Sequence, residues 1–197
     1  MSNLFASGRC KFIAGAMQFN QLPQANCPEA AFIGRSNAGK SSLINALVGV
    51  NCARVSKTPG RTRQINCFSL GENFMLADLP GYGYAAVSKK MHKAWDELIL
   101  DYLKYRKNLR RVFLLVDSRH GFKDSDMEVM KLLDYLGTVY QVVFTKIDKI
   151  SNFDVNAVQE QLNKHPSAFP EIILTSSENK LGIEKLRHVI QELAVFS

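Results

Sequence analysis

A chain of 197 residues, 46% of them hydrophobic, is long enough for one domain with a sizeable core, and its formal net charge of +7 favours an acidic partner. The four cysteines are scattered and include no C-x-x-C pair, which argues against a zinc site or a disulfide framework and favours a reducing cytosol. Because no apolar run approaches the roughly 20 residues that span a bilayer, and residues 1–19 lack the pattern of a secretory signal, we expect a cytoplasmic protein without a membrane partner.

The beginning of the chain differs from the rest. Residues 1–28 are mixed in character and end in a proline-punctuated stretch. We interpret them as an N-terminal arm that packs on the domain, with room for an edge strand, and residues 29–197 as a single domain. That domain opens with the apolar run 30–33, which suits a buried parallel strand.

The sequence GRSNAGKS follows this run and fits the phosphate-binding pattern G-x-x-x-x-G-K-[ST], with apolar residues at helical spacing directly after it. The glycines let backbone N–H groups face phosphate oxygens, and the helix N-terminus adds its positive dipole end. A turn that binds nothing is the alternative, but a chance match is expected in only about one per cent of such chains. The predicted phosphate loop consists of Gly34, Arg35, Ser36, Asn37, Ala38, Gly39, Lys40 and Ser41.

Strand and helix patterns alternate along the rest of the chain. After a polar loop over residues 51–63, a strand is predicted over residues 64–70, with residues 74–78 as its hairpin partner. Asp124 or Ser125 is the expected cap of a helix over residues 124–136. Further helices are predicted over residues 91–106, 155–163 and 183–193, and further strands over residues 112–117, 139–144 and 172–174. This order predicts an α/β fold, a three-layer P-loop domain with a mostly parallel sheet and one antiparallel hairpin strand.

Three more predicted strand ends carry polar motifs. In open α/β sheets, ligands bind beyond the carboxyl ends of the strands. Each motif alone is weak, and Asp148 can equally cap a helix, but their order and shared position make a joint coincidence very unlikely. The motifs are Asp78, Leu79, Pro80 and Gly81; Thr145, Lys146, Ile147 and Asp148; and Thr175, Ser176 and Ser177.

The chemistry of these residues suits a guanine nucleotide. Lys40 can reach the β- and γ-phosphates, while the Ser41 hydroxyl ligates Mg²⁺. Asp78 can hold a water on that ion, and the Gly81 N–H can contact the γ-phosphate. The carboxylate of Asp148 can accept two N–H bonds from guanine, whereas adenine has no exocyclic amine there. The stem of Lys146 can lie along the base plane, and Ser176 or Ser177 can offer N–H groups to the guanine oxygen. These motifs predict a site for GTP and GDP with Mg²⁺.

Taken together, GRSNAGKSS, KTPGRT, DLPGYGYA, TKID and TSSENKLG resemble the EngB (YihA/YsxC) family of ribosome-biogenesis GTPases, from about residue 30 to the C-terminus. Era-like GTPases append an RNA-binding domain and EngA-like ones carry two GTPase domains, whereas this chain has one set of motifs. The resemblance makes Thr62 a second Mg²⁺ ligand beside Ser41. Thr145 stands where many GTPases have Asn, and the EngB family commonly has Thr there.

The resemblance also implies roles for individual residues and for the protein. The groups expected to act on the γ-phosphate are Lys40, Thr62 and Gly81. The nucleotide-binding set is extended by Gly60, Arg61, Thr62, Arg63 and Gln64. A monomer that assists assembly of the large ribosomal subunit is implied, with links to the cell cycle and septation. The alternatives are an RNA-binding factor with incidental hydrolysis, an Era-like GTPase acting on another RNA, and a P-loop kinase, against which the Asp148 motif argues.

Two residues of the motifs each have two interpretations. Tyr82 follows Gly81 where Ras-like enzymes place a water-orienting Gln, so we expect slow intrinsic hydrolysis unless Tyr82 is only a packing residue. Asn37 can turn its side-chain carbonyl toward the phosphates and complete a cage for K⁺. Its alternative role is to tolerate an unusual loop conformation.

Basic residues gather in three groups, two of which border the expected switch loops. This placement favours contact with ribosomal RNA, on the large subunit or its precursor, that depends on the nucleotide; a solvated face is the alternative. The groups are Lys57, Arg61 and Arg63; Lys89, Lys90 and Lys93; and Lys104, Arg106, Lys107, Arg110 and Arg111, with Tyr102 and Tyr105 nearby.

Overall fold

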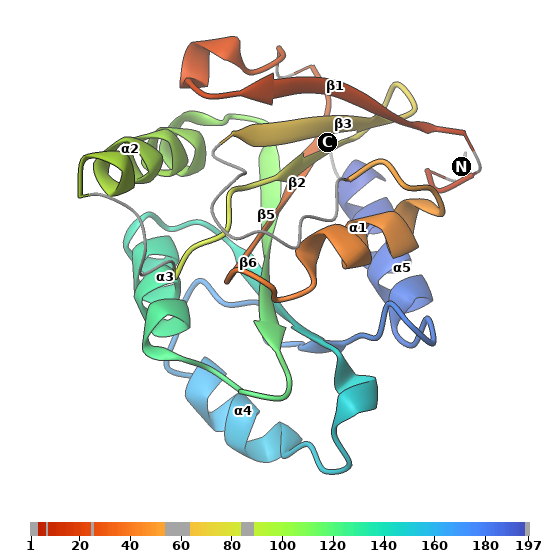
Figure 1. Ribbon diagram of the computed structural model, residues 1–197, viewed down its shortest axis with the longest axis vertical. Helices are drawn as coiled ribbons and strands as arrows, with labels where there is room; N and C mark the ends of the chain where they lie inside the picture. The colour runs from red at the N-terminus through yellow and green to blue at the C-terminus, as the bar shows by residue number, and fades with distance from the viewer. Residues whose placement is uncertain (1–3, 7, 25, 54–63, 84–88, 196–197) are drawn as a thin grey trace.

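The computed structural model describes the chain except residues 1–3, 7, 25, 54–63, 84–88 and 196–197, and the side chains of residues 89–96 (Figure 1). Its strands are β1 (Cys10–Ala16), β2 (Glu29–Gly34), β3 (Ile65–Leu70), β4 (Met75–Asp78), β5 (Leu109–Asp117), β6 (Tyr140–Thr145) and β7 (Ile173–Leu174). Its α-helices are α1 (Lys40–Val48), α2 (Lys89–Tyr105), α3 (Asp124–Tyr135), α4 (Val155–Leu162) and α5 (Ile183–Val195). Two short 3-10 helices are η1 (Phe19–Gln21) and η2 (Ile147–Lys149).

Within the described residues, the strands form one sheet in the order β1-β3-β4-β2-β5-β6-β7. Strand β2 pairs in parallel with β4 on one side and β5 on the other, and β6 and β7 continue the parallel part. Strand β3 is antiparallel to both β4 and β1, so it alone runs against the others. The predicted mostly parallel sheet with one antiparallel hairpin strand is confirmed, and the parallel strands end on the same edge.

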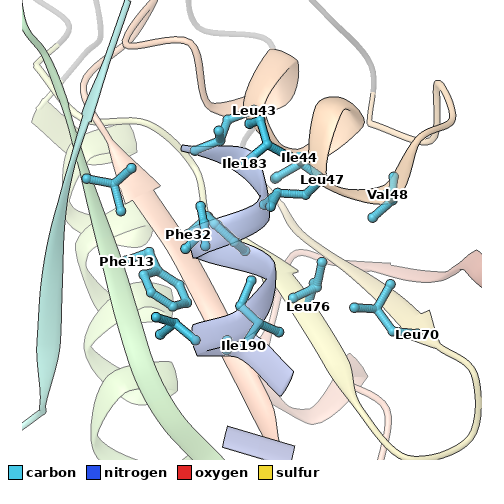
Figure 2. Close-up of a cluster of buried hydrophobic side chains, with 14 of the residues drawn as sticks. Phe32, Leu43, Ile44, Leu47, Val48, Leu70, Leu76, Phe113, Ile183 and Ile190 are labelled. Atoms are coloured by element: carbon cyan, nitrogen blue, oxygen red, sulfur yellow. The ribbon is translucent and has the colours of Figure 1, made fainter. Parts of the chain in front are cut away.

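Helices cover both faces of this sheet, as Figure 1 shows, with α1 and α5 on one face and α2 and α3 on the other. Strand β2 explains why. All its residues are buried, and successive side chains face opposite sides of the sheet, with Phe32 in one apolar cluster and Ile33 in the other. Phe32 stacks on Phe113 of β5 with ring centroids 5.2 Å apart. Leu43 of α1 and Ile190 of α5 belong to the same cluster as these rings, and Figure 2 shows Leu43 beside Ile183 of α5. The three layers follow from burial of both sheet faces.

The predicted cap of α3 is wrong. The helix begins at Asp124, but its N-cap residue is Lys123. A lysine side chain cannot accept a hydrogen bond, so the cap comes from within the helix: the carboxylate of Asp126 accepts the backbone N–H of Lys123 at 2.8 Å. Asp126 is only 1% exposed.

The third basic group also needs correction. Arg106 is buried and donates to both carboxylate oxygens of Glu29, at 2.9 and 2.8 Å. The hydroxyl of Tyr102, fully buried, donates to the same carboxylate at 2.5 Å. Arg111 packs over the ring of Phe169, 4.0 Å from its centroid. Tyr102 and Arg106 thus hold the end of α2 to Glu29 at the start of β2. The exposed cations of the group are Lys104, Lys107 and Arg110.

The described part of the chain contains no helix that is both long and apolar enough to cross a membrane.

Candidate nucleotide-binding site

The predicted phosphate loop runs from the end of β2 into α1. Its residue before the helix, Gly39, has φ of 90°, a conformation that strains residues with a side chain. Gly34 lies so close to β5 that a Cβ would approach the Leu115 carbonyl oxygen to 2.8 Å. The N–H of Ala38 donates to the Arg35 carbonyl at 3.0 Å and closes a turn. A tight loop therefore leads to the N-terminus of a nine-residue helix, where anions bind favourably.

Asn37, inside this loop, also has a left-handed backbone, with φ of 63°. Asparagine tolerates this region better than most residues because its short polar side chain can bond locally. Its side chain is exposed, and its backbone carbonyl oxygen accepts a hydrogen bond from the Lys146 ammonium group at 2.6 Å. The structure thus gives Asn37 a conformational role, and the role of its side-chain carbonyl in K⁺ binding stays a prediction.

The lysine of the phosphate loop contacts the carboxylate of the second motif. Lys40 donates to Asp78 in a salt bridge whose side chains are 12% and 5% exposed. Strand β4 pairs with β2 so that Asp78 lies opposite Phe32, two residues before Gly34. The parallel register of these two strands therefore brings together the residues predicted for the phosphates and for the hydration shell of Mg²⁺.

Backbone hydrogen bonds hold the rest of the second motif against the phosphate loop. The N–H of Leu79 donates to the Phe32 carbonyl at 2.9 Å, and Pro80 after it is buried. A Cβ on Gly81 would lie 3.2 Å from the Gly34 carbonyl oxygen, so this glycine permits a close approach. The Ser36 N–H donates to the backbone carbonyl of Tyr82, the residue directly after Gly81, at 3.1 Å. A movement of Gly81 would therefore displace backbone groups that contact the phosphate loop.

Tyr82, the next residue, turns its side chain toward α3. The side chain is 6% exposed, and its hydroxyl donates to Asp126 at 2.7 Å. Burial and the neighbouring Asp126 carboxylate raise the pKa of Tyr82 well above its ordinary value, so the hydroxyl keeps its proton. In this structure the buried side chain of Tyr82 joins the end of the second motif to α3.

The third motif supports the phosphate loop from the side predicted for the base. The hydroxyl of Thr145, at the end of β6, donates to the Ala38 carbonyl at 2.5 Å. Lys146 has φ of 58°, and its ammonium group reaches both the Asn37 carbonyl and, at 2.7 Å, the carboxylate of Asp117. Two adjacent residues of the motif thus fix two adjacent carbonyls of the loop.

Asp117 and Arg119, in the turn after β5, were not predicted as site residues. Arg119 donates to both carboxylate oxygens of Asp117, at 2.9 and 2.7 Å. Burial opposes ionisation of Asp117, but the hydrogen bonds from Arg119 and Lys146 outweigh it and hold the pKa of Asp117 well below its ordinary value. The available signal was its position: β5 lies between β2 and β6, so its carboxyl end falls between two predicted motifs.

This turn and the phosphate loop enclose a cavity of about 300 Å³. Its wall includes four predicted residues of the loop and, opposite them, the turn after β5 and one carboxylate of α3. The lining residues are Arg35, Ser36, Asn37, Ala38, Leu115, Asp117, Arg119, His120, Gly121 and Asp126.

Asp148 lies in η2, beside the fourth motif. Hydrogen bonds from Ser176 and then from Lys149 lower the pKa of Asp148, so the carboxylate is ionised at neutral pH. The Ile147 N–H donates to the Thr175 carbonyl at 3.2 Å, which joins the third motif to the fourth. Ser176 is fully buried, and Ser177 after it is partly exposed. The residues predicted to read guanine are therefore neighbours in space.

Part of the predicted site lies outside the described residues: Gly60, Arg61, Thr62 and Arg63, and with them the predicted Mg²⁺ ligand of the first switch. Gln64 is described. Its amide donates to Asn66 of β3 at 2.8 Å and lies over Gly15 of β1, so its described contacts are with these two strands.

The residues present suit Mg²⁺. This ion favours oxygen ligands and usually keeps several waters while it binds substrate phosphates through one or two protein groups. The hydroxyl of Ser41 in the first turn of α1, and the carboxylate of Asp78 near Lys40, are groups of this kind. The described residues hold no cluster of three or more His, Cys, Asp or Glu that could bind a metal ion without the nucleotide.

Comparisons with known proteins place this geometry in a family. A family model described as "50S ribosome-binding GTPase" matches residues 29–146. The chain is similar to the "Probable GTP-binding protein EngB" of Cereibacter sphaeroides, with 49% identity over 96% of this chain and 90% of that protein. It is also similar to the protein of the same name from Caulobacter vibrioides, with 45% identity over 98% of this chain and 87% of that protein.

Solved structures agree with these relatives. The crystal structure of a probable GTP-binding protein engB matches with 28% identity and a TM-score of 0.67, over 84% of this chain and 98% of that one. Aquifex aeolicus Era bound to GDP and AlF4⁻ matches with 24% identity and a TM-score of 0.68, over 84% of this chain and 56% of that one. The second likeness supports the fold.

Proposed function

Because this chain belongs to the EngB family of P-loop GTP-binding proteins, we propose that it hydrolyses GTP slowly and uses the cycle to assist assembly of the large ribosomal subunit. The observation that carries the proposal is the convergence of four motifs on one edge of the sheet. Lys40 contacts Asp78, Thr145 and Lys146 hold the phosphate loop, and the third motif is bonded to the fourth.

Lys40 and Asp78 explain how phosphate binding is coupled to the second motif. In their salt bridge each side chain neutralises the other while both are largely buried. Lys40 exchanges this partner for phosphate oxygens when GTP binds, which frees the Asp78 carboxylate. Ser41 and Thr62 would ligate Mg²⁺, and Asp78 would hold a water on it. The ion would neutralise charge that develops on the phosphates. The exchange avoids leaving a charge buried without a partner.

The base is chosen by Asp148. Its ionised carboxylate accepts two N–H groups of guanine in a charge-assisted pair, and adenine cannot supply them. The ammonium group of Lys146 is held by both the Asn37 backbone carbonyl and the Asp117 carboxylate, so its aliphatic stem is preorganised to lie against the base.

Switching follows from Gly81. Its N–H contacts the γ-phosphate of GTP and has no such partner after hydrolysis. Tyr82, the residue after Gly81, exchanges backbone hydrogen bonds with Gly34 and Ser36 of the phosphate loop, and its hydroxyl donates to Asp126 of α3. Tyr82 has no amide with which to orient a water, and its hydroxyl is engaged by α3, which supports a slow intrinsic rate.

Support for the ribosomal partner comes from the family and from charge. The matching family model is described by its binding to the 50S ribosome. The net charge of +7 and the exposed Lys104, Lys107 and Arg110 suit an RNA backbone. The second basic group, Lys89, Lys90 and Lys93, follows the γ-phosphate-sensing motif by only a few residues, which couples docking to the nucleotide. Links to the cell cycle and septation remain predictions.

Co-sedimentation tests this function. The full chain is centrifuged with large ribosomal subunits under GDP, GTP or a non-hydrolysable GTP analogue, and small subunits serve as the matched control. We expect more protein with the large subunit under GTP and the analogue than under GDP. Equal sedimentation in all three states contradicts nucleotide-dependent docking.

A second candidate is an RNA-binding factor whose hydrolysis is incidental. Multiple-turnover GTP hydrolysis with and without ribosomal particles separates the two functions. A switch is accelerated by its particle, because hydrolysis is the step that releases it. An unchanged rate favours the RNA-binding factor.

A further inference from the structure

Two cysteines that are far apart in the sequence meet in the structure. The Sγ atoms of Cys10, at the start of β1, and Cys52, in the loop after α1, lie 3.2 Å apart. A disulfide has an S–S distance of about 2.04 Å, so the two sulfurs need to approach by only about 1.2 Å to form one. Both residues are partly exposed, and both pack on the apolar cluster between α1 and the sheet.

We propose that Cys10 and Cys52 form a reversible disulfide, a redox-sensitive modification site at the point where the chain enters residues 54–63. The oxidant is a low-molecular-weight disulfide of the glutathione class. In the reduced protein the two groups are free thiols.

The two thiols differ in reactivity because one donates to the other. The S–H of Cys10 donates a hydrogen bond to the sulfur of Cys52. This bond lowers the pKa of Cys52, against burial and the negative charge of Asp78, and it raises the pKa of Cys10, which burial raises further. Cys52 is therefore the thiolate that attacks first.

The reaction balances in two exchange steps. The Cys52 thiolate attacks one sulfur of oxidised glutathione, forming a mixed disulfide and releasing one glutathione thiolate. Cys10 then loses its proton to solvent, and its sulfur attacks that of Cys52, forming the protein disulfide and releasing the second glutathione. Both released thiolates take up protons, so two protein thiols are oxidised while one glutathione disulfide is reduced to two thiols.

The other two cysteines provide matched controls. Cys67 is fully buried in β3, and burial raises its pKa to about 12. Cys27 is partly exposed like the reactive pair, but burial, with the nearby Glu29 carboxylate, raises its pKa. Cys10 and Cys52 form the one thiol–thiol contact between described side chains.

The disulfide would constrain the entry to the first switch. Asn45 of α1 holds Ala53, next to Cys52, through two hydrogen bonds of 2.9 and 2.8 Å. Cys10 pairs with Leu70 of β3, the strand that follows residues 54–63. A covalent link therefore ties the entry of this segment to the edge of the sheet. The segment contains Thr62, so the expected effect on hydrolysis rests on the proposed function, whereas disulfide formation does not.

The test incubates the purified full chain in mixtures of reduced and oxidised glutathione, traps free thiols with a maleimide and maps peptides by mass. We expect a peptide containing Cys10 linked to one containing Cys52, in the wild type and in Cys27→Ser alike, and its disappearance under reduced glutathione. In Cys10→Ser the mixed disulfide with glutathione should accumulate on Cys52, because the second thiol is missing. In Cys52→Ser neither product should form.

A link that involves Cys27 or Cys67, or a wild type that stops at the mixed disulfide, overturns the proposal. GTP hydrolysis is then compared on the oxidised and reduced forms. We expect a several-fold loss on oxidation that Cys52→Ser does not show, and equal rates would remove the regulatory effect. If reduced protein hydrolyses no GTP while the link still forms, the proposed function fails and the thiol pair stands.

Discussion

The hydroxyl of Tyr82 donates to the carboxylate of Asp126 at 2.7 Å, which joins the second nucleotide motif to the first turn of α3. The same carboxylate accepts the Lys123 N–H and so caps the helix. One buried group thus serves both the start of α3 and the residue that follows Gly81, the glycine predicted to contact the γ-phosphate. A displacement of Gly81 would therefore move Tyr82 and change its hydrogen bond to the residue that caps α3.

Tyr82→Phe tests this link. Removing the hydroxyl leaves a buried carboxylate with one donor fewer, so we expect the free energy of unfolding to fall by roughly 1.5–3 kcal/mol in chemical denaturation. Tyr135→Phe is the control, because Tyr135 is 86% exposed, and its effect should stay within about 0.5 kcal/mol. Intrinsic single-turnover hydrolysis should stay within about a factor of two. A large loss of rate with unchanged stability would instead give Tyr82 a role at the phosphates.

Asp117→Asn tests the carboxylate that the motifs did not reveal. The depressed pKa of Asp117 means that its ionised form stabilises the folded protein. This contribution is complete above the ordinary carboxyl pKa of about 4 and is lost as the pH falls toward the lower folded value. We expect Asn to lower stability by about 1–2 kcal/mol at pH 7, and the difference from wild type to shrink below about pH 4. Glu171→Gln, in an exposed pair with Lys185, is the control; a pH-independent difference contradicts the electrostatic cause.

Asp148→Asn tests base recognition. The amide places a donor where guanine also presents donors, so GTP should bind more weakly, by roughly 1.5–3 kcal/mol or one to two decades in affinity. The affinity for xanthine nucleotides should rise. Glu178→Gln is the matched control, because Glu178 is exposed and pairs with the same Lys149 as Asp148. Calorimetry that finds unchanged GTP affinity in Asp148→Asn removes this residue from the base site.

The basic residues after the second switch are tested by salt dependence. Replacing Lys89, Lys90 and Lys93 with Ala should reduce the slope of log affinity for large subunits against log salt, by somewhat less than one for each phosphate that the variant no longer neutralises. Nucleotide affinity should be unchanged. A triple Ala variant at Lys104, Lys107 and Arg110 tests the exposed cations of the third basic group. An unchanged slope in both variants shows that docking uses another surface.

The fold was accessible from the sequence because its signals are local. Leu98, Ile99 and Leu103 recur at helical spacing within the predicted helix over residues 91–106, and all three are buried in α2. Gly49 caps α1 with φ of 72°, a position at which glycine is a common helix-ending signal in sequences. The sequence could also predict that the motifs lie close together, because the loops that follow parallel strands all lie at one edge of the sheet.

Long-range partners were not accessible in this way. A run of basic residues shows charge but cannot show that Arg106 pairs with Glu29, which lies 77 residues earlier. Asp117 binds Lys146 from 29 residues away, and the thiols of Cys10 and Cys52 are separated by 42 residues. The α3 cap was misplaced for a local reason, because its carboxylate comes from the third residue of the helix rather than from the residue before it.

Asn37 poses the sharpest remaining choice, and its backbone decides how to test it. A K⁺ cage requires the side-chain carbonyl, whereas the loop requires only a residue that accepts φ of 63°. Asn37→Ala removes the carbonyl but also introduces strain, because alanine rarely adopts this conformation. Asn37→Gly removes the carbonyl and keeps the conformation accessible. The glycine variant is therefore the informative one, and alanine measures the strain.

Hydrolysis is measured in K⁺ and in Na⁺ at equal ionic strength for the wild type and both variants, with GTP affinity measured in each salt. For a cage, K⁺ accelerates the wild type, and both variants lose that acceleration although Asn37→Gly keeps its stability. For a conformational residue, Asn37→Gly retains the wild-type response while Asn37→Ala loses stability and affinity in both salts alike. We expect the first outcome, because Tyr82 supplies no amide and negative charge between the β- and γ-phosphates still has to be offset. Retained K⁺ stimulation in the glycine variant contradicts it.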